Sequence, residues 1–242
     1  MKRDRLAPVL AIVGGAIVLV VALVIASQIG SGSKKSSIGT IATDSVAEML
    51  GGIKQNGIYL GDPKAKLTLV EFADPQCPGC AEFAQTVFPS LVQKYVRSGK
   101  LRIEYQGQHF IDDFIRNSPK DSERMLRLAQ AAGFQSKLWY VVELEYDNQP
   151  QNSENSGYAT DSYLRGVASA VNGLNVDKAL TVANTNAVVS NMDAAKALAD
   201  KSFKQLSTPS FLLGPTGAKP TEKFGNESLS AFSAAIDAQL KK

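Results

Sequence analysis

The longest apolar pattern in the chain lies near its N-terminus. Residues 6–29, LAPVLAIVGGAIVLVVALVIASQI, contain no charged side chain, and the next charge comes only at Lys34. As a helix these 24 residues reach about 36 Å at 1.5 Å per residue, more than the roughly 30 Å hydrocarbon layer of a membrane. The pattern therefore predicts one transmembrane signal-anchor helix over residues 6–29.

The charges before this helix predict its orientation. Three basic residues lie among residues 1–5, and positive residues stay on the cytoplasmic side of a membrane. Residues 1–5 would then be cytoplasmic, residues 30–42 a linker, and residues 43–242 an extracytoplasmic domain held at the cell membrane by a single pass. A cleaved secretory signal that ends near Ala26 is the alternative, and it exports the domain equally.

Within the domain, strand and helix periods alternate. Residues 66–74, KLTLVEFAD, are apolar on both faces, which predicts a buried central strand. From Pro78 to Arg97 apolar residues recur every four positions, which predicts a helix that Pro89 should kink. Residues 99–107 alternate between apolar and polar and predict a second strand. Strand, helix and strand in this order are typical of an α/β fold.

The rest of the domain is mainly helical. Residues 121–204 contain five helical patterns separated by polar loops, at 122–134, 137–149, 160–173, 176–186 and 192–203. A β-hairpin is predicted around Gly214–Gly217, followed by a terminal amphipathic helix from Leu229 to Leu240 with Asn226 as its N-cap. Shorter patterns predict a helix at 43–51 and an extended piece at 58–60.

The charge balance argues against a nucleic-acid surface. The formal net charge is +3, from 26 basic and 23 acidic residues. The first five residues hold three of these bases and one acid, so residues 6–242 carry 23 bases and 22 acids. The sequence also lacks a glycine-rich nucleotide-binding loop. We therefore expect no nucleic-acid partner and no bound cofactor.

Both cysteines of the chain lie in one stretch, FADPQCPGCAEF, residues 72–83. As a structural bridge, so short a loop would stabilise the fold by only about 2 kcal/mol. A zinc site needs about four ligands, and the chain has a single histidine, His109, which we expect to end a strand without a special role. The sequence therefore predicts no metal site, and it favours a redox pair over a structural bridge.

A CxxC pair that follows a buried strand and opens a helix is typical of redox chemistry. Cys77 would lie beside unpaired backbone N–H groups at the positive end of the helix, which favours its thiolate and makes it the attacking sulfur. Cys80, one turn further on, is placed to resolve a mixed disulfide. Pro78 suits the first helical turn, where a missing N–H costs nothing.

Three stretches, residues 57–83, 138–157 and 207–214, resemble the membrane-anchored, BdbD-type form of the DsbA-like branch of the thioredoxin superfamily. This resemblance implies a thioredoxin fold into which the helices of residues 121–204 are inserted. It also implies that the Thr208–Pro209 peptide bond is cis and faces the cysteines. The residues expected to bind substrate are Pro78, Gly79, Thr208 and Pro209.

Glu71 lies six residues before Cys77, on the strand predicted to be buried. An unpaired buried carboxylate is costly in free energy. Either the end of this strand is exposed to solvent, or Glu71 is kept there for a function. The resemblance implies a role, because an acid at this position helps to move the proton of the buried cysteine. Gly79 departs from the family pattern, since strongly oxidising members have a histidine there. We therefore expect a milder oxidant.

The sequence thus predicts an extracytoplasmic protein-disulfide oxidoreductase that introduces disulfides into exported proteins with cysteine pairs. The resemblance also implies a membrane partner that reoxidises it, of the DsbB or vitamin K epoxide reductase type. Two other interpretations stay open. The same fold could serve as an outward-facing disulfide reductase or isomerase, or as a non-enzymatic binding module whose CxxC is a structural bridge.

Overall fold

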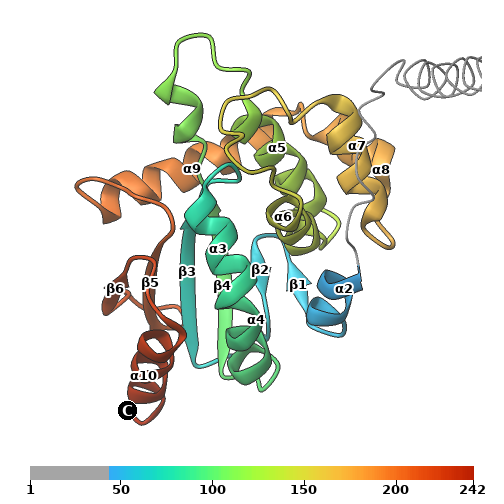
Figure 1. Cartoon of the computed structure of the whole chain (residues 1–242). Helices are drawn as coiled ribbons and strands as arrows, with labels where there is room; N and C mark the ends of the chain where they lie inside the picture. Colours follow the sequence, from blue (N-terminus) through green and yellow to red (C-terminus); the bar gives the residue numbers. More distant parts are fainter. Residues whose placement is uncertain (1–43) are drawn as a thin grey trace, which may run out of the picture. The chain divides into compact units, whose positions relative to one another are not determined.

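The structure, a computed structural model, describes residues 44–242 (Figure 1). The predicted transmembrane helix at 6–29 and the linker at 30–42 lie outside the described residues. Within residues 44–242, no helix is long and apolar enough to cross a membrane.

A mixed sheet forms the centre of the domain, with the strand order β1-β2-β4-β3-β5-β6. Strand β3, Leu67–Ala73, is the predicted central strand, and all of its residues are buried. It runs parallel to β4, because a helical crossover returns the chain to the same end of the sheet, and antiparallel to β5. The other strands are β1 (Gln55–Asn56), β2 (Tyr59–Leu60), β4 (Leu101–Gly107), β5 (Ser210–Pro215) and β6 (Glu222–Phe224).

The helix predicted from residue 78 to residue 97 is interrupted near Pro89, as expected. It consists of α3 (Pro78–Thr86), α4 (Phe88–Leu91) and a π-helical turn, η1 (Val92–Val96). Pro89 has no N–H to donate to the carbonyl of Gln85, so the α-helical ladder cannot continue through it. The π turn was not predicted.

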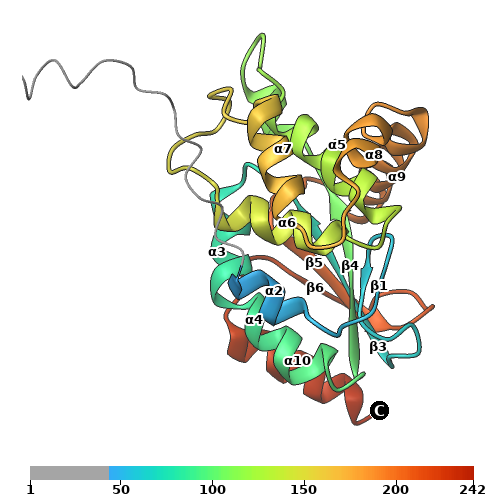
Figure 2. The same cartoon turned by 90° about the vertical axis from the view of Figure 1, so that its right-hand side faces the viewer.

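The predicted insertion is confirmed, because five α-helices lie between β4 and β5 (Figures 1 and 2). They are α5 (Asp121–Gly133), α6 (Leu138–Asp147), α7 (Asp161–Ala170), α8 (Val176–Val182) and α9 (Asn186–Ser202). A short 3-10 helix, η2 (Phe110–Phe114), precedes them. Helix α9 begins earlier than the predicted residue 192, because buried Val188 extends the stripe of Met192 and Ala195 by one turn.

Both faces of the sheet are covered. Side chains of β3 alternate between the faces, so Leu67 and Leu69 enter the main core, whereas Val70 and Phe72 pack against α9. The main core is closed by α3, α6 and the terminal helix α10 (Leu229–Leu240). In Figure 2, α4 and α10 lie side by side on this face. The short helix α2 (Asp44–Leu50) is also where the sequence predicted it.

One predicted detail near the C-terminus is wrong. Ser228, not Asn226, caps α10. The backbone of Ser228 is extended, and its hydroxyl accepts a hydrogen bond from the Ala231 N–H over 3.3 Å. The predicted β-hairpin is confirmed, because β5 and β6 pair antiparallel and Gly217 adopts a positive φ of 78° in the turn between them.

Gly107, at the end of β4, lies where the core leaves no room for a side chain. A Cβ atom there would clash with Leu126 Cδ1 and lie 2.8 Å from Tyr105 Cε1. We predict that Gly107→Ala lowers the free energy of unfolding by about 1–3 kcal/mol, measured by chemical denaturation. Gly225→Ala is the control, because its Cβ would meet no atom within 4 Å. Equal losses in the two variants would contradict the prediction.

Candidate active site

Cys77 and Cys80 lie where the loop after β3 enters α3. Cys77 occupies the N-cap position and Pro78 the first turn, as predicted. The Cys77 carbonyl accepts hydrogen bonds from the N–H groups of Cys80 and Ala81, each over 3.1 Å. Both cysteines are free thiols, but only Cys77 reaches the surface, with 8% exposure against 0% for Cys80.

The environment of Cys77 favours its thiolate and lowers its pKa to about 6. The largest cause is a hydrogen bond with the side chain of Cys80; burial opposes the shift. The Thr208 side chain and the backbone N–H groups of Cys80 and Gly79 add further stabilisation. In its protonated form, Cys77 donates to the Thr208 carbonyl oxygen over 3.3 Å. A reactive thiolate at the start of a helix is what the sequence predicted.

The pKa of Cys80 is shifted in the opposite direction. Burial raises it well above the ordinary thiol value, and the hydrogen bond with Cys77 and the charge of Cys77 add to this effect. At neutral pH, Cys80 is therefore protonated whenever the pair is reduced. The two sulfurs of one short motif have opposite preferences because one meets hydrogen-bond donors and the other is enclosed.

The Thr208–Pro209 peptide bond is cis, as the resemblance implied. It lies against the cysteine motif, since a Cβ atom placed on Gly79 would lie 3.4 Å from Pro209 Cδ and 3.8 Å from Cys77 Sγ. The chain therefore brings together two segments 131 residues apart. The predicted substrate-binding residues Pro78, Gly79, Thr208 and Pro209 all lie at this one end of the sheet.

Glu71 is buried with 2% exposure, so the interpretation that its end of the strand is wet is wrong. Glu71 lies on the same face of β3 as Leu69 and Ala73. These two residues, and side chains of α3, belong to the main core. Burial raises the pKa of Glu71 to about 8. Its Oε2 atom has no hydrogen-bond partner among the described residues, and its charge acts on Cys80. Glu71 is therefore an uncompensated carboxyl on the buried side of the pair.

The protein family follows from a match that covers most of the domain. The family model described as thioredoxin matches residues 54–238. The chain belongs to the thioredoxin family.

Named relatives agree with this assignment. A "Putative protein-disulfide oxidoreductase" of Rickettsia conorii is 27% identical over 195 residues, which cover 78% of this chain and 62% of that protein. A "Probable disulfide bond formation protein D" of Bacillus cereus is 31% identical over 97 residues, which cover 39% of this chain and 42% of the relative. The chain thus spans less than two thirds of the length of either relative.

Solved structures show the same DsbA-like version of the thioredoxin fold. The alpha-DsbA1 protein of Wolbachia pipientis superposes with a TM-score of 0.61 at 21% identity, over 79% of this chain and 92% of that one. BdbD from Bacillus subtilis, in its oxidised form, gives 0.62 at 17% identity, over 78% and 98%. The fold expected from the resemblance, with its helical insertion, is therefore confirmed.

Sequence reasoning missed a buried hydrogen-bond network beneath this thioredoxin-family site. Asp74 accepts hydrogen bonds from the N–H groups of Gln76 and Ile111 and from the Ser122 hydroxyl. The Gln76 side chain donates to Asp112 over 2.9 Å and to Ser122 over 2.7 Å. The loop that leads to Cys77 is thereby fastened to η2 and to the start of α5. No local signal could reveal this, because the partners lie 36 to 48 residues apart.

Asn226 also belongs to the site, although the sequence predicted only a helix cap. Its Nδ2 atom lies 3.8 Å from the position of a Cβ on Gly79. The loop between β6 and α10 therefore borders the cysteine motif.

Among residues 44–242, no group of three His, Cys, Asp or Glu side chains is placed to hold a metal ion.

The low pKa of Cys77 should make the stability of the reduced protein depend on pH. A thiol whose pKa is lowered on folding adds stability that is complete above its ordinary value of 9.0 and is lost as the pH falls through about 6. We predict that the unfolding free energy of the reduced wild type exceeds that of reduced Cys77→Ser by up to about 4 kcal/mol more at pH 9 than at pH 5. Denaturant titrations at both pH values measure this, and parallel pH profiles would contradict it.

Proposed function

We propose that this protein is a thiol–disulfide oxidoreductase that introduces disulfides into exported proteins through Cys77 and Cys80. The observation that carries the proposal is the pairing of Cys77, which is 8% exposed and has a pKa of about 6, with a fully buried Cys80 whose pKa is raised. A low pKa stabilises the reduced form of the pair, and a pair that is stable when reduced is an oxidant. The names of the relatives support the same activity.

The reaction begins with the oxidised pair. A substrate thiolate attacks Cys77 Sγ, the Cys77–Cys80 bond breaks, and Cys80 leaves as a thiolate that must take up a proton. A second substrate thiolate then attacks the substrate sulfur of this mixed disulfide, and Cys77 leaves as its stabilised thiolate. The substrate loses two electrons to form its disulfide, and the cysteine pair gains them. Attack by Cys80 on the mixed disulfide reverses the first step.

Glu71 is suited to supply the proton that Cys80 needs. With a pKa of about 8, it is mainly protonated at neutral pH, and it lies on the enclosed side of the pair where water does not reach. Its charge disfavours a charge on Cys80, so the two groups prefer to share one negative charge between them. Glu71 thus buffers the buried thiolate in both directions of exchange.

The substrate chain would bind in an extended form beside Thr208 and Pro209, with Pro78 and Gly79 on the other side of the attacked sulfur. The Thr208 carbonyl, 3.3 Å from Cys77 Sγ, is available to pair with a substrate N–H once the thiol proton is gone. A polar cavity of about 440 Å³ opens beside Pro78, lined by Gln76, Glu82, Gln85 and Gln149 among others. It gives a polar substrate segment room along α3.

The cellular setting is part of the same proposal. The apolar run at residues 6–29 supports a membrane anchor, with the catalytic domain outside the cytoplasm. A membrane reoxidant of the DsbB or vitamin K epoxide reductase type would then take electrons from the reduced pair. The rival direction, an outward-facing reductase or isomerase, uses the same residues. The lowered pKa of Cys77 disfavours the other rival, an inert bridge in a binding module.

The reduction potential of the Cys77–Cys80 pair tests the direction. Equilibrating the full-length chain with glutathione buffers should give a value above about −180 mV, the region of disulfide donors. A value near −270 mV, at the thioredoxin end, would support the reductase instead. A pair that does not exchange would support the structural bridge.

Gly79 offers a way to move this potential. A Cβ atom there meets only ordinary contacts of 3.4 Å or more, so larger residues can enter. We predict that Gly79→His raises the potential, because an imidazolium beside Cys77 stabilises its thiolate; each tenfold gain in the reduced form corresponds to about 30 mV. Gly79→Ala is the control without the charge. Equal potentials for the two variants would refute the electrostatic explanation.

Glu71→Gln removes the proton donor and keeps the size of the side chain. We predict at least an approximately tenfold slower oxidation of a peptide dithiol at pH 7, and loss of the rate inflection near pH 8. Glu145→Gln is the matched control, since Glu145 is equally buried but acts on Tyr158 and Tyr163 and not on the cysteines. A wild-type pH profile in Glu71→Gln would exclude the proposed role.

A further inference from the structure

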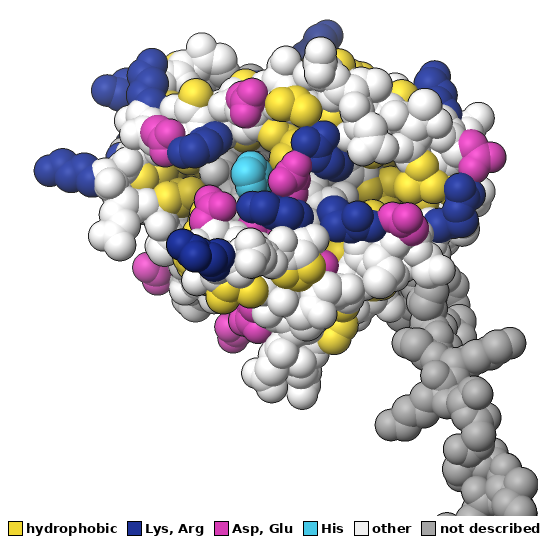
Figure 3. Space-filling view, turned by 90° about the horizontal axis from the view of Figure 1, so that it is seen from above, with side chains coloured by type: hydrophobic (Ala, Val, Ile, Leu, Met, Phe, Trp, Pro, Cys, Tyr) yellow, Lys and Arg dark blue, Asp and Glu magenta, His cyan; other side chains and the backbone are white. Residues whose placement is uncertain are grey.

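A second cavity, of about 240 Å³, lies between the loop after β4 and helix α9. Its walls include His109 from the loop, Phe110 from η2, Met192 and Lys196 from α9, and Leu206 from the segment that leads to the cis peptide bond. Figure 3 views the molecule from the end where β3 and β4 finish, and shows the single histidine in a hollow of this face. The reaction described above makes no use of this cavity.

The cavity adjoins the place where the substrate chain is proposed to bind. Leu206 lies two residues before Thr208, whose carbonyl oxygen is 3.3 Å from Cys77 Sγ. Two residues of chain span at most roughly 7 Å, so Leu206 lies within that distance of Thr208 along the backbone. A substrate paired with this segment would therefore bring its second residue from the cysteine over the cavity.

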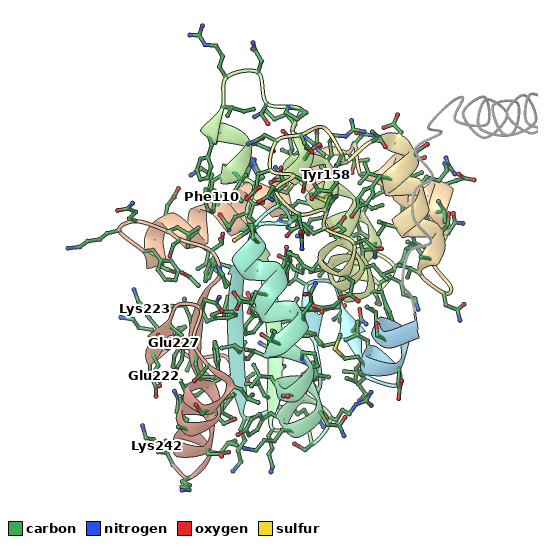
Figure 4. The ribbon with its side chains drawn as sticks, in the orientation of Figure 1. Phe110, Tyr158, Glu222, Lys223, Glu227 and Lys242 are labelled. Carbon is green, nitrogen blue, oxygen red and sulfur yellow. The ribbon has the colours of Figure 1, made fainter. Side chains whose placement is uncertain are left out.

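The walls are suited to an apolar side chain. Phe110, Met192 and Leu206 are hydrophobic. The charged wall residues are paired, Lys196 with Asp200 over 2.9 Å and Asp113 with Lys120 over 3.6 Å. Figure 4 shows Phe110 at this end of the domain, near α9. Cavities that hold whole small molecules usually measure about 300–1,000 Å³, so this one has room for a single large side chain.

Two further observations point to an occupant. The apolar surface continues outward from Phe110, whose ring packs edge-on against Phe114 at a centroid distance of 5.5 Å. Phe114 is 68% exposed and Ile115 48% exposed, although solvated large hydrophobic groups add nothing to folding. In addition, the buried Nδ1 atom of His109 has no partner within residues 44–242, so an N–H group of a bound chain would relieve its desolvation.

We propose that this cavity is a specificity subsite, which binds an aromatic side chain of the protein substrate two residues from the cysteine that Cys77 engages. The inference rests on the proposed function. It makes the protein selective for cysteines in aromatic surroundings, which an unfolded exported protein exposes before its core has formed.

The test uses the oxidised full-length chain and two peptides of equal length, each with a pair of cysteines. One peptide carries Phe at the second position on either side of each cysteine, and the other carries Ser. Each peptide gives two electrons and two protons to the Cys77–Cys80 disulfide as its own disulfide forms, and acid-quenched chromatography follows the product. We expect the second-order rate constant of this single exchange to be about tenfold higher for the Phe peptide, equivalent to 1.4 kcal/mol.

Leu206→Ser removes an apolar wall and should reduce this preference to about twofold or less, with the Ser peptide reacting as in the wild type. Leu198→Ser is the matched control. Leu198 and Leu206 are both partly buried and pack against the same cluster of Val70, Phe72 and Leu212, but Leu198 does not line the cavity. Leu198→Ser should therefore keep the tenfold preference.

The outcomes separate the two proposals. If neither peptide reacts with the wild type, the proposed function fails, and this inference fails with it. If both react at equal rates, the function stands and the subsite is refuted. A preference that survives Leu206→Ser, or that Leu198→Ser abolishes equally, also refutes the subsite.

Discussion

The stabilisation of negative charge on the Cys77 sulfur is the interaction on which the rest of the site depends. The sulfur lies at the start of α3, where the Cys80 side chain, the Thr208 side chain and two backbone N–H groups can all donate to it. These donors come from two segments of the chain, and both must be held rigidly for the thiolate to keep them. The buried strand β3 precedes the cysteine loop, and β5, which begins directly after Pro209, is hydrogen-bonded to β3.

The same arrangement makes the two sulfurs unequal. Cys77 can leave or attack as an anion at neutral pH, whereas an anion on Cys80 would be enclosed with no solvent. A buried charge without a partner is expensive, so exchange at Cys77 has to be coupled to a proton on the inner side. Glu71 is the buried carboxyl to which we assign that proton. In the proposed mechanism, exchange at the Cys77 sulfur therefore depends on the buried Glu71 carboxyl.

The helical insertion covers the sheet and also holds the cysteine loop in place. Asp74 and Gln76, in the loop that leads to Cys77, form hydrogen bonds with Asp112 and Ser122. These partners lie where the insertion begins. Because these groups are buried and mutually bonded, the loop cannot shift without leaving polar groups unpaired. The insertion also supplies α9, which forms one side of the cavity proposed to read the substrate. Positioning and selectivity would then have a common structural origin.

Local sequence determined much of this protein. The sequence predicted β3, the interrupted helix and β4 from the periodicity of apolar residues at 66–107, the cysteine spacing and Pro89. Local patterns were sufficient because these elements depend on neighbours within a few residues. The position of the cis peptide bond came from resemblance to a family, not from any rule about single residues.

Tertiary structure decided the rest. Whether Glu71 was wet or enclosed depended on α3 and the core packing over it, which the strand pattern alone does not specify. Asn226 was read as a helix cap, because an Asn before an amphipathic run is a local signal, but Ser228 took that position and Asn226 came to border Gly79. The contact of Thr208 with Cys77 spans 131 residues. Such contacts are set by how the whole chain packs, and no short stretch of sequence contains that information.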